Sequence, residues 1–147
     1  MTSSDIWYKT FDVGSKKGGF DKLSPIQQQL YTFLDFHISI EMDGAFGFLY
    51  NRNFEDPEDN LYEPYIICLR YFHYDHLADL LQQFSDGYIA GLRNETKTNG
   101  TWEGQLKTYG LTKLAKQLEK EANKILGARE VTKWIDEHHV ELAVGLS

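Results

Sequence analysis

The sequence has little of what disulfide-rich, cysteine-based zinc or catalytic proteins require. Cys68 is the only cysteine in 147 residues, which excludes an internal disulfide and any zinc module built from several cysteines. It lies in the apolar run YIICLRYF, where a free cysteine is typical of a buried and unreactive position. The sequence also lacks a nucleophile elbow and a glycine-rich phosphate loop. We therefore expect neither enzyme activity nor a cofactor.

Long apolar runs are missing too. No window approaches the roughly 20 apolar residues that a membrane-spanning helix needs. The first residues, MTSSDIWYKTF, lack the basic segment and apolar stretch of a signal peptide. The expectation is a cytoplasmic protein without membrane contact.

Positive charge is in deficit. The chain has 22 acidic and 15 basic residues, giving a formal net charge of -7. This field opposes binding to a nucleic-acid backbone, whose affinity comes from Lys and Arg displacing counterions. An acidic surface instead suits a cationic protein partner, or serves solubility alone.

What the sequence does have is helical periodicity. Apolar residues make up 41% and aromatics 14% of the chain, enough for one folded core over residues 1–147. Ser24 and Pro25 are typical of a helix start, and Gly44 of a helix end followed by a short second helix. Further helices are predicted at about 61–72, 75–92, 112–126 and 130–139, with a bend or break at 85–87 and a long turn-rich connection over 94–110. The first 22 residues form an N-terminal segment, predicted as a short helix near 6–11 and a loop. The fold class predicted is all-α, a single compact domain of about five to seven helices.

One stretch of this pattern resembles a known family. The run LSPIQQQLYTFLDFHISIEMDGAFGFLYN is similar to the signature of bacterial acidic DNA-mimic proteins and their uncharacterised relatives, and the C-terminal VTKWIDEHHVEL is similar to the way such chains finish. The matching residues are Glu41, Gly44, Phe46, Leu49, Tyr50 and Asn51, whereas Asp43, Ala45 and Gly47 depart from the family pattern. The resemblance implies an all-helical acidic protein that forms a homodimer in some members. The studied type displays carboxylates spaced like DNA phosphates and occupies the groove of a DNA-binding protein.

The residues themselves indicate where a partner would bind. Acidic side chains cluster after the signature, and between residues 53 and 86 the only basic residue is Arg70. The partner-binding residues predicted from this clustering are Glu55, Asp56, Glu58, Asp59, Asp75 and Asp79. The function predicted is a module that occupies a cationic protein surface, as a DNA mimic of a DNA-binding protein. The same charge would also suit an immunity protein that neutralises a basic toxin.

Histidine pairs raise a third alternative. His73 and His76 flank Asp75, and His138 and His139 lie between Glu137 and Glu141. Two histidines on one helical face with a carboxylate can bind zinc, so a metal-dependent hydrolase is the enzyme-class alternative. We expect no metal site, because a helix start at Asp75 would separate the first pair.

Overall fold

The described part of the chain contains helices and no strands. The computed structural model describes residues 1–50, 62–94, 102–125 and 129–146. In chain order the elements are α1 (Ser3–Ser15), the 3-10 helix η1 (Phe20–Lys22), α2 (Pro25–Tyr50), α3 (Glu63–Tyr71), α4 (Asp75–Asn94), α5 (Trp102–Thr108), α6 (Thr112–Lys124), α7 (Arg129–Glu137) and α8 (His139–Ala143). The predicted all-α class is confirmed, with eight α-helices in these residues rather than five to seven.

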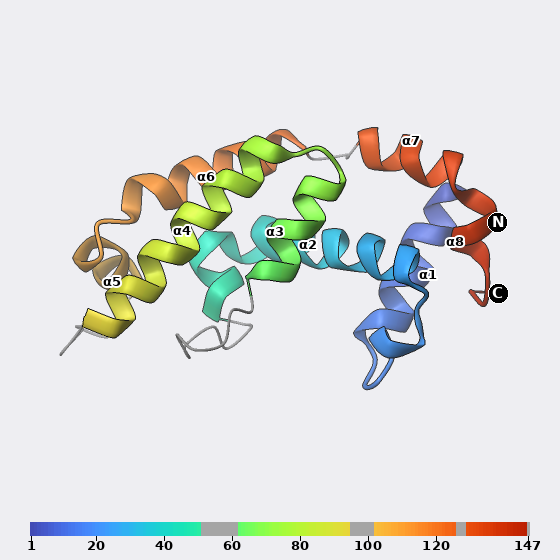
Figure 1. The fold of residues 1–147 in the computed structure, drawn as a ribbon, viewed down its shortest axis with the longest axis horizontal. Helices are drawn as coiled ribbons and strands as arrows, with labels where there is room; N and C mark the ends of the chain where they lie inside the picture. The colour runs from blue at the N-terminus through green and yellow to red at the C-terminus, as the bar shows by residue number, and fades with distance from the viewer. Residues whose placement is uncertain (51–61, 95–101, 126–128, 147) are drawn as a thin grey trace.

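Helix α2 runs along the middle of the molecule and joins two groups of helices (Figure 1). At one end, α1, α7 and α8 pack against each other, and α1 and α8 also pack on α2. At the other end, α3 and α6 contact α2 while α4 packs against both of them. Both ends of the chain lie in the first group, away from α4 and α5 (Figure 1).

The start of α2 follows the capping chemistry of its sequence. The amide of Gln27 donates to Ser24 Oγ (3.4 Å), and the amide of Ser24 donates to Gln27 Oε1 (2.9 Å). Pro25 is the first helical residue, where its missing N–H costs nothing. The Gln27 side chain also donates to the carbonyls of Leu142 (2.9 Å) and Val144 (2.8 Å). One side chain therefore caps α2 and holds the C-terminal segment against it.

The N-terminal helix is longer than the predicted 6–11. It starts at Ser3 because Thr2 and Asp5 form a reciprocal cap, in which each backbone amide donates to the other side chain. It runs to Ser15, and η1 follows.

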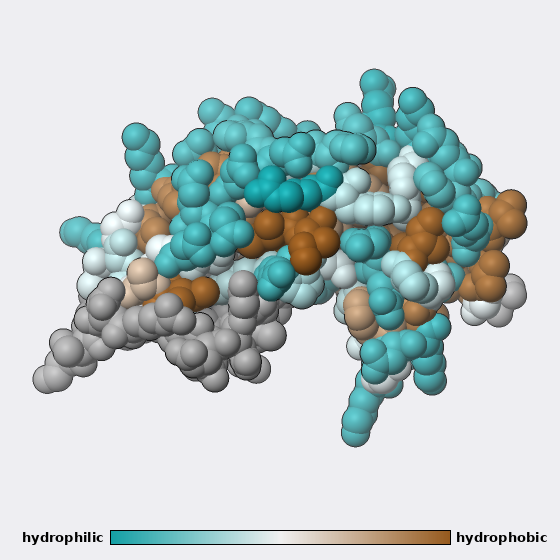
Figure 2. All heavy atoms as spheres, viewed as in Figure 1, coloured by the Kyte–Doolittle hydropathy of each residue, from teal (hydrophilic) through white to brown (hydrophobic). Residues whose placement is uncertain are grey.

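The core is formed by apolar side chains from both helix groups. Among the described residues, α2 contributes more of these side chains than any other helix. Their rings pack edge to face or stack, as for Phe36 on Phe48 at 5.3 Å. The largest fully buried side chains are Tyr62, Phe33, Phe36, Phe48, Phe84, Ile6, Leu30, Leu34, Leu69, Leu81 and Leu118. On the face seen in Figure 2, hydrophilic side chains cover much of the coloured surface, and apolar side chains reach it near α3 and at the α1 and α8 end.

Of the bend or break predicted at residues 85–87, the break is wrong, because α4 continues through them to Asn94. Gly87 lies where a Cβ would come 2.6 Å from Leu111 Cδ2, and Gly91 where a Cβ would come 2.5 Å from the Tyr109 ring. These glycines allow neighbouring side chains to pack closely on α4; they do not end the helix.

Two other boundaries also differ from prediction. The connection expected over 94–110 contains α5, and the helix expected at 130–139 is divided into α7 and α8 around His138.

Candidate functional site

The family-like stretch forms a corner within α2. Gly44 has φ 72° and ψ -177°, a conformation that is essentially restricted to glycine. The amide of Ala45 just after it donates to Glu119 Oε1 of α6 at 2.8 Å. A Cβ on Gly44 would come 2.7 Å from the same oxygen. The predicted turn at Gly44 is thus confirmed, and Glu119 supplies a hydrogen-bond acceptor at the start of the helical segment that follows it.

The predicted carboxylates divide into two sets. Glu55, Asp56, Glu58 and Asp59 lie outside the described residues. Asp75 and Asp79 are on α4, with side chains 66% and 55% exposed.

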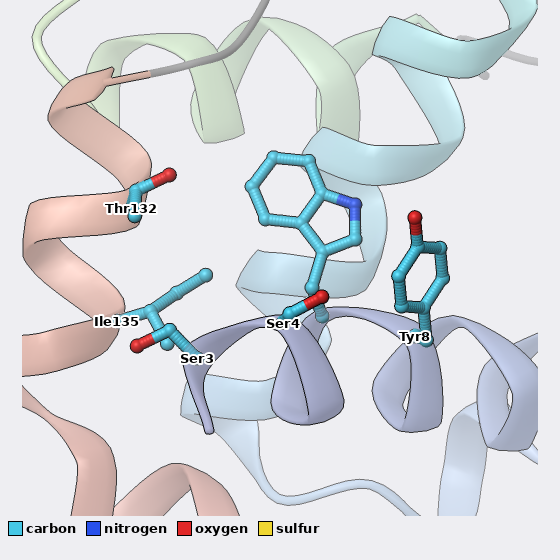
Figure 3. Close-up of a pocket in the computed structure, with 6 residues that line it drawn as sticks. Ser3, Ser4, Tyr8, Thr132 and Ile135 are labelled. Atoms are coloured by element: carbon cyan, nitrogen blue, oxygen red, sulfur yellow. The ribbon is translucent and has the colours of Figure 1, made fainter.

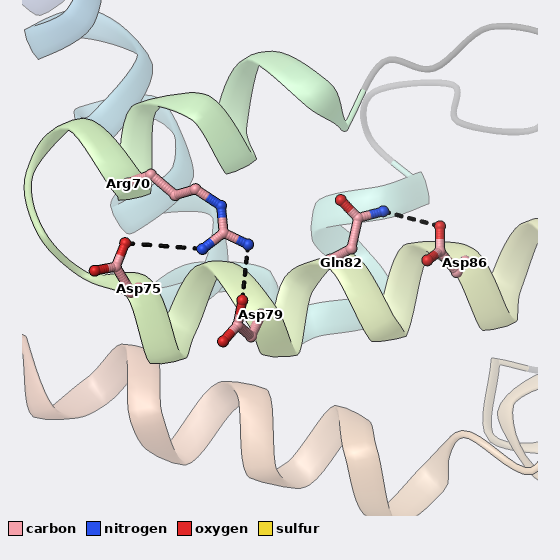
Figure 4. A network of polar contacts seen from close by, with 5 residues as sticks. All are labelled: Arg70, Asp75, Asp79, Gln82 and Asp86. Carbon is pink, nitrogen blue, oxygen red and sulfur yellow. Dashed lines mark hydrogen bonds and ion pairs between the residues drawn. The ribbon is translucent and has the colours of Figure 1, made fainter.

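Asp75 and Asp79 converge on Arg70, the basic residue of α3 (Figure 4). Arg70 Nη2 donates to Asp79 Oδ1 at 2.7 Å, and Nη1 lies 3.7 Å from Asp75 Oδ1. One guanidinium therefore neutralises one of the two charges, and the trio keeps a net charge of -1. Because all three side chains are largely exposed, water screens these ion pairs.

A third carboxylate, which the prediction did not select, continues the same side of α4. Asp86 is exposed, and its Oδ1 accepts a hydrogen bond from Gln82 Nε2 at 2.9 Å. Figure 4 shows Asp75, Asp79 and Asp86 along the side of α4 that faces α3. We call these three residues the acidic flank. The signal that could have found Asp86 is the helical spacing 75, 79, 82 and 86, which places polar side chains on one face.

Helix α6 packs against α4 and carries an excess of basic residues. Its exposed lysines include Lys113, Lys116 and Lys120. Within the described ranges, none of these lysines forms an ion pair with a carboxylate of α4. In this part of the chain, the lysines of α6 therefore do not neutralise the carboxylates of α4 by direct contact.

Two of the histidines contact backbone carbonyl groups. His138 Nδ1 lies 2.9 Å from the carbonyl oxygen of Trp134, and His139 Nε2 contacts the carbonyl oxygen of Met1. His73 precedes α4, and His76 lies within its first turn. In the part of the chain that the structure describes, no three His, Cys, Asp or Glu side chains are grouped to hold a metal ion.

The buried position predicted for Cys68 is confirmed, and His37 is buried as well. Cys68 is 1% exposed, its thiol donates to the carbonyl of Gln29 at 3.3 Å, and burial raises the pKa of the thiol far above its usual value. His37 is 8% exposed and stacks on Phe33 with ring centroids 5.9 Å apart. Burial lowers the pKa of His37, an effect that nearby Glu41 opposes.

A small cavity of about 230 Å³ opens between α1 and α7 (Figure 3). It is lined by Ser3, Ser4, Trp7, Tyr8, Thr132 and Ile135. None of these residues is charged, so this cavity is chemically distinct from the acidic flank.

No helix in the described ranges combines the length and the apolar character required to cross a bilayer.

Comparison with known proteins gives one match. The family described as DMP19-like protein matches residues 21–138, which contain the corner at Gly44, the acidic flank and α6. No curated protein and no solved structure matches the chain.

Proposed function

Because the chain belongs to the DMP19-like protein family, we propose that it is an acidic binding protein that occupies the cationic surface of another protein. The surface proposed is the acidic flank, together with the four sequence-predicted carboxylates between residues 55 and 59. The single observation that carries this proposal is the exposed row of Asp75, Asp79 and Asp86 along α4 (Figure 4).

The spacing of that row supports DNA mimicry as the finer form of the proposal. A helix rises 1.5 Å per residue, so Asp75 and Asp79 are separated by about 6 Å along the axis, and Asp79 and Asp86 by about 10 Å. One strand of B-DNA advances about 3.4 Å per phosphate, so these separations correspond to about two and about three phosphate steps. A surface that binds a DNA strand would thus find negative charge at intervals that it already recognises.

The ion pair at Arg70 is compatible with this role. A cationic partner can compete with Arg70 for Asp75 and Asp79, because exposed pairs contribute little stability. Electrostatic attraction of this kind accelerates association and weakens as salt is added.

The experiment compares two variants that change net charge equally. D75N/D79N/D86N neutralises the acidic flank, whereas D12N/D21N/E141Q neutralises three exposed carboxylates on other elements. Each immobilised protein is incubated with lysate of the source cells, and the captured proteins are identified by mass spectrometry over a salt series. We expect the first variant to lose salt-sensitive capture of basic proteins by about tenfold or more, and the second to retain it. If both variants lost capture equally, net charge alone would be the cause. If both retained capture, the acidic flank would be excluded as the binding surface.

Competition then separates the DNA mimic from the immunity protein. If the chain is a DNA mimic, added duplex DNA should displace it from the captured protein. If it neutralises a basic toxin at a surface that does not bind DNA, duplex DNA should leave the complex intact, and the chain should protect cells that express the toxin.

A further inference from the structure

A second cavity lies between the end of α3 and α7, with a volume of about 440 Å³. Two segments about sixty residues apart line it. Both contribute aromatic rings, and α7 also contributes two carboxylates. The lining residues are Tyr71, Phe72, His73, Glu130, Trp134 and Glu137. None of them belongs to the acidic flank or to the predicted partner-binding set.

Three rings in this cavity stand nearly at right angles to one another. The centroids of Tyr71 and Phe72 are 5.1 Å apart with an interplanar angle of 89°. Trp134 lies 5.9 Å from Tyr71 at 86° and 4.9 Å from Phe72 at 85°. Pairs at these distances are edge-to-face packing contacts that hold the rings in place, and Tyr71, at 43% exposure, is the most accessible of the three to a cation in the cavity.

The carboxylates at this cavity add negative charge. Both Glu130 and Glu137 are exposed. Glu130 Oε2 accepts a hydrogen bond from Tyr74 Oη at 3.2 Å, which leaves its charge in place. Glu137 Oε1 lies 4.0 Å from Lys133 Nζ, a pair so exposed that water screens it strongly. The cavity therefore offers two carboxylates beside three rings.

The backbone beside the rings is held in an unusual conformation. His73 has φ 64°, the left-handed position where a helix commonly ends with glycine. The amides of Tyr74 and His73 donate to the carbonyls of Leu69 (2.8 Å) and Arg70 (3.0 Å), the two bonds of a Schellman motif. This motif fixes the end of α3 and with it the positions of Tyr71 and Phe72.

We infer that this cavity binds the ammonium group of a lysine side chain carried by the partner protein. Ring faces attract a cation through their quadrupole, and the carboxylates add Coulombic attraction. Glu130 and Glu137 would repel an anion. A purely apolar group would displace water from these carboxylates without offering them a hydrogen bond or an opposite charge. The lysine being on the partner rests on the proposed function, whereas ammonium binding follows from the cavity alone.

The test uses the full chain and three small probes of one shape. They are Nα-acetyl-lysine N-methylamide, its Nε-trimethyl form, and the uncharged norleucine compound. The indole N–H resonance of Trp134, assigned with W134F, is followed by NMR during each titration. Saturable shifts are expected with both ammonium probes and none with the norleucine compound. Absence of a saturable shift with the cations, or an equal shift with norleucine, would overturn the inference.

Two variants locate the binding. Y71L removes one wall at a side chain that is already 43% exposed, so the fold should tolerate it, and it should weaken trimethyl-lysine binding about tenfold. E130Q/E137Q should weaken lysine binding more at low salt than at high salt. W7F, in the cavity between α1 and α7, is the matched control and should leave both affinities unchanged.

The outcomes separate this inference from the proposed function. If capture depends on the acidic flank but no probe binds the cavity, only the cavity inference fails. If the probes bind with the expected pattern but no basic protein depends on the flank, only the proposed function fails.

Discussion

The corner at Gly44 and the acidic flank are both parts of the family-matched region, yet they are built in opposite ways. The corner joins α2 to α6 through a backbone conformation that only glycine adopts easily and a hydrogen bond to Glu119. The flank consists of exposed side chains whose contacts, at Arg70 and Gln82, are also exposed. The first region determines how helices pack, and the second determines what the surface presents.

This difference explains why the family resemblance predicts helix packing but not the charge of the surface. A sequence signature at the corner identifies the packing of α2 against α6, because few residues satisfy its geometry. The same signature says nothing about charge on α4. The two regions should therefore respond differently to substitution: the corner through stability, the flank through binding.

The largest effect is expected at Gly44. Alanine there would be forced into a glycine conformation and would place its Cβ 2.7 Å from Glu119 Oε1, so G44A should lower the free energy of unfolding by about 3 kcal/mol. G110A is the matched control, because Gly110 has φ 71° with nothing within 4 Å of an added Cβ, and it should cost only about 1 kcal/mol. Urea unfolding measures both. Equal losses would mean that neither the backbone conformation of Gly44 nor its contact with Glu119 adds to the cost.

An intermediate effect is expected at His37, in the buried part of α2 before the corner. Because its pKa in the folded state lies below the ordinary 6.5, the unfolded chain takes up a proton first as the pH falls. Its contribution to stability is thus present above pH 6.5 and is lost as the pH drops below that value. H37F should flatten this part of the stability profile measured by urea unfolding between pH 7.5 and 5.5. Parallel profiles for the two proteins would contradict the assignment.

The smallest effect on stability is expected on the flank. D79N removes the charge that Arg70 contacts at 2.7 Å, but both side chains are about half exposed. The free energy of unfolding should change by no more than about 0.5 kcal/mol. A loss comparable to that of G44A would show that the flank is structural, and the contrast between the two regions would disappear.

Local chemistry explains which parts of the fold were predictable. Ser24 followed by Pro25 predicts the start of α2, and Gly44 predicts its corner, because each effect depends on neighbouring backbone groups. The break predicted from Gly87 was wrong, because this glycine allows Leu111, from a distant part of the chain, to pack closely on α4. A glycine that ends a helix and one that permits close packing look alike in one sequence.

The acidic flank and the aromatic cavity were likewise predictable only where they depend on neighbours along the sequence. Clustering along the sequence indicated Asp75 and Asp79, but it could not show that both contact Arg70. The aromatic cavity was not predicted, because Tyr71 and Trp134 are brought together only when α7 returns to the end of α3. Sequence spacing reports neighbours within one helix, whereas this cavity depends on the packing of two.

The hydrogen bonds from Gln27 to the carbonyls of Leu142 and Val144 have a practical consequence. They hold the last residues beside the start of α2, where α1 also packs, so both chain ends lie together and away from α4 (Figure 1). A tether at either end to a biosensor surface should leave α4 turned toward bulk solution. The orientation needed to measure binding to the flank is therefore available without internal labelling.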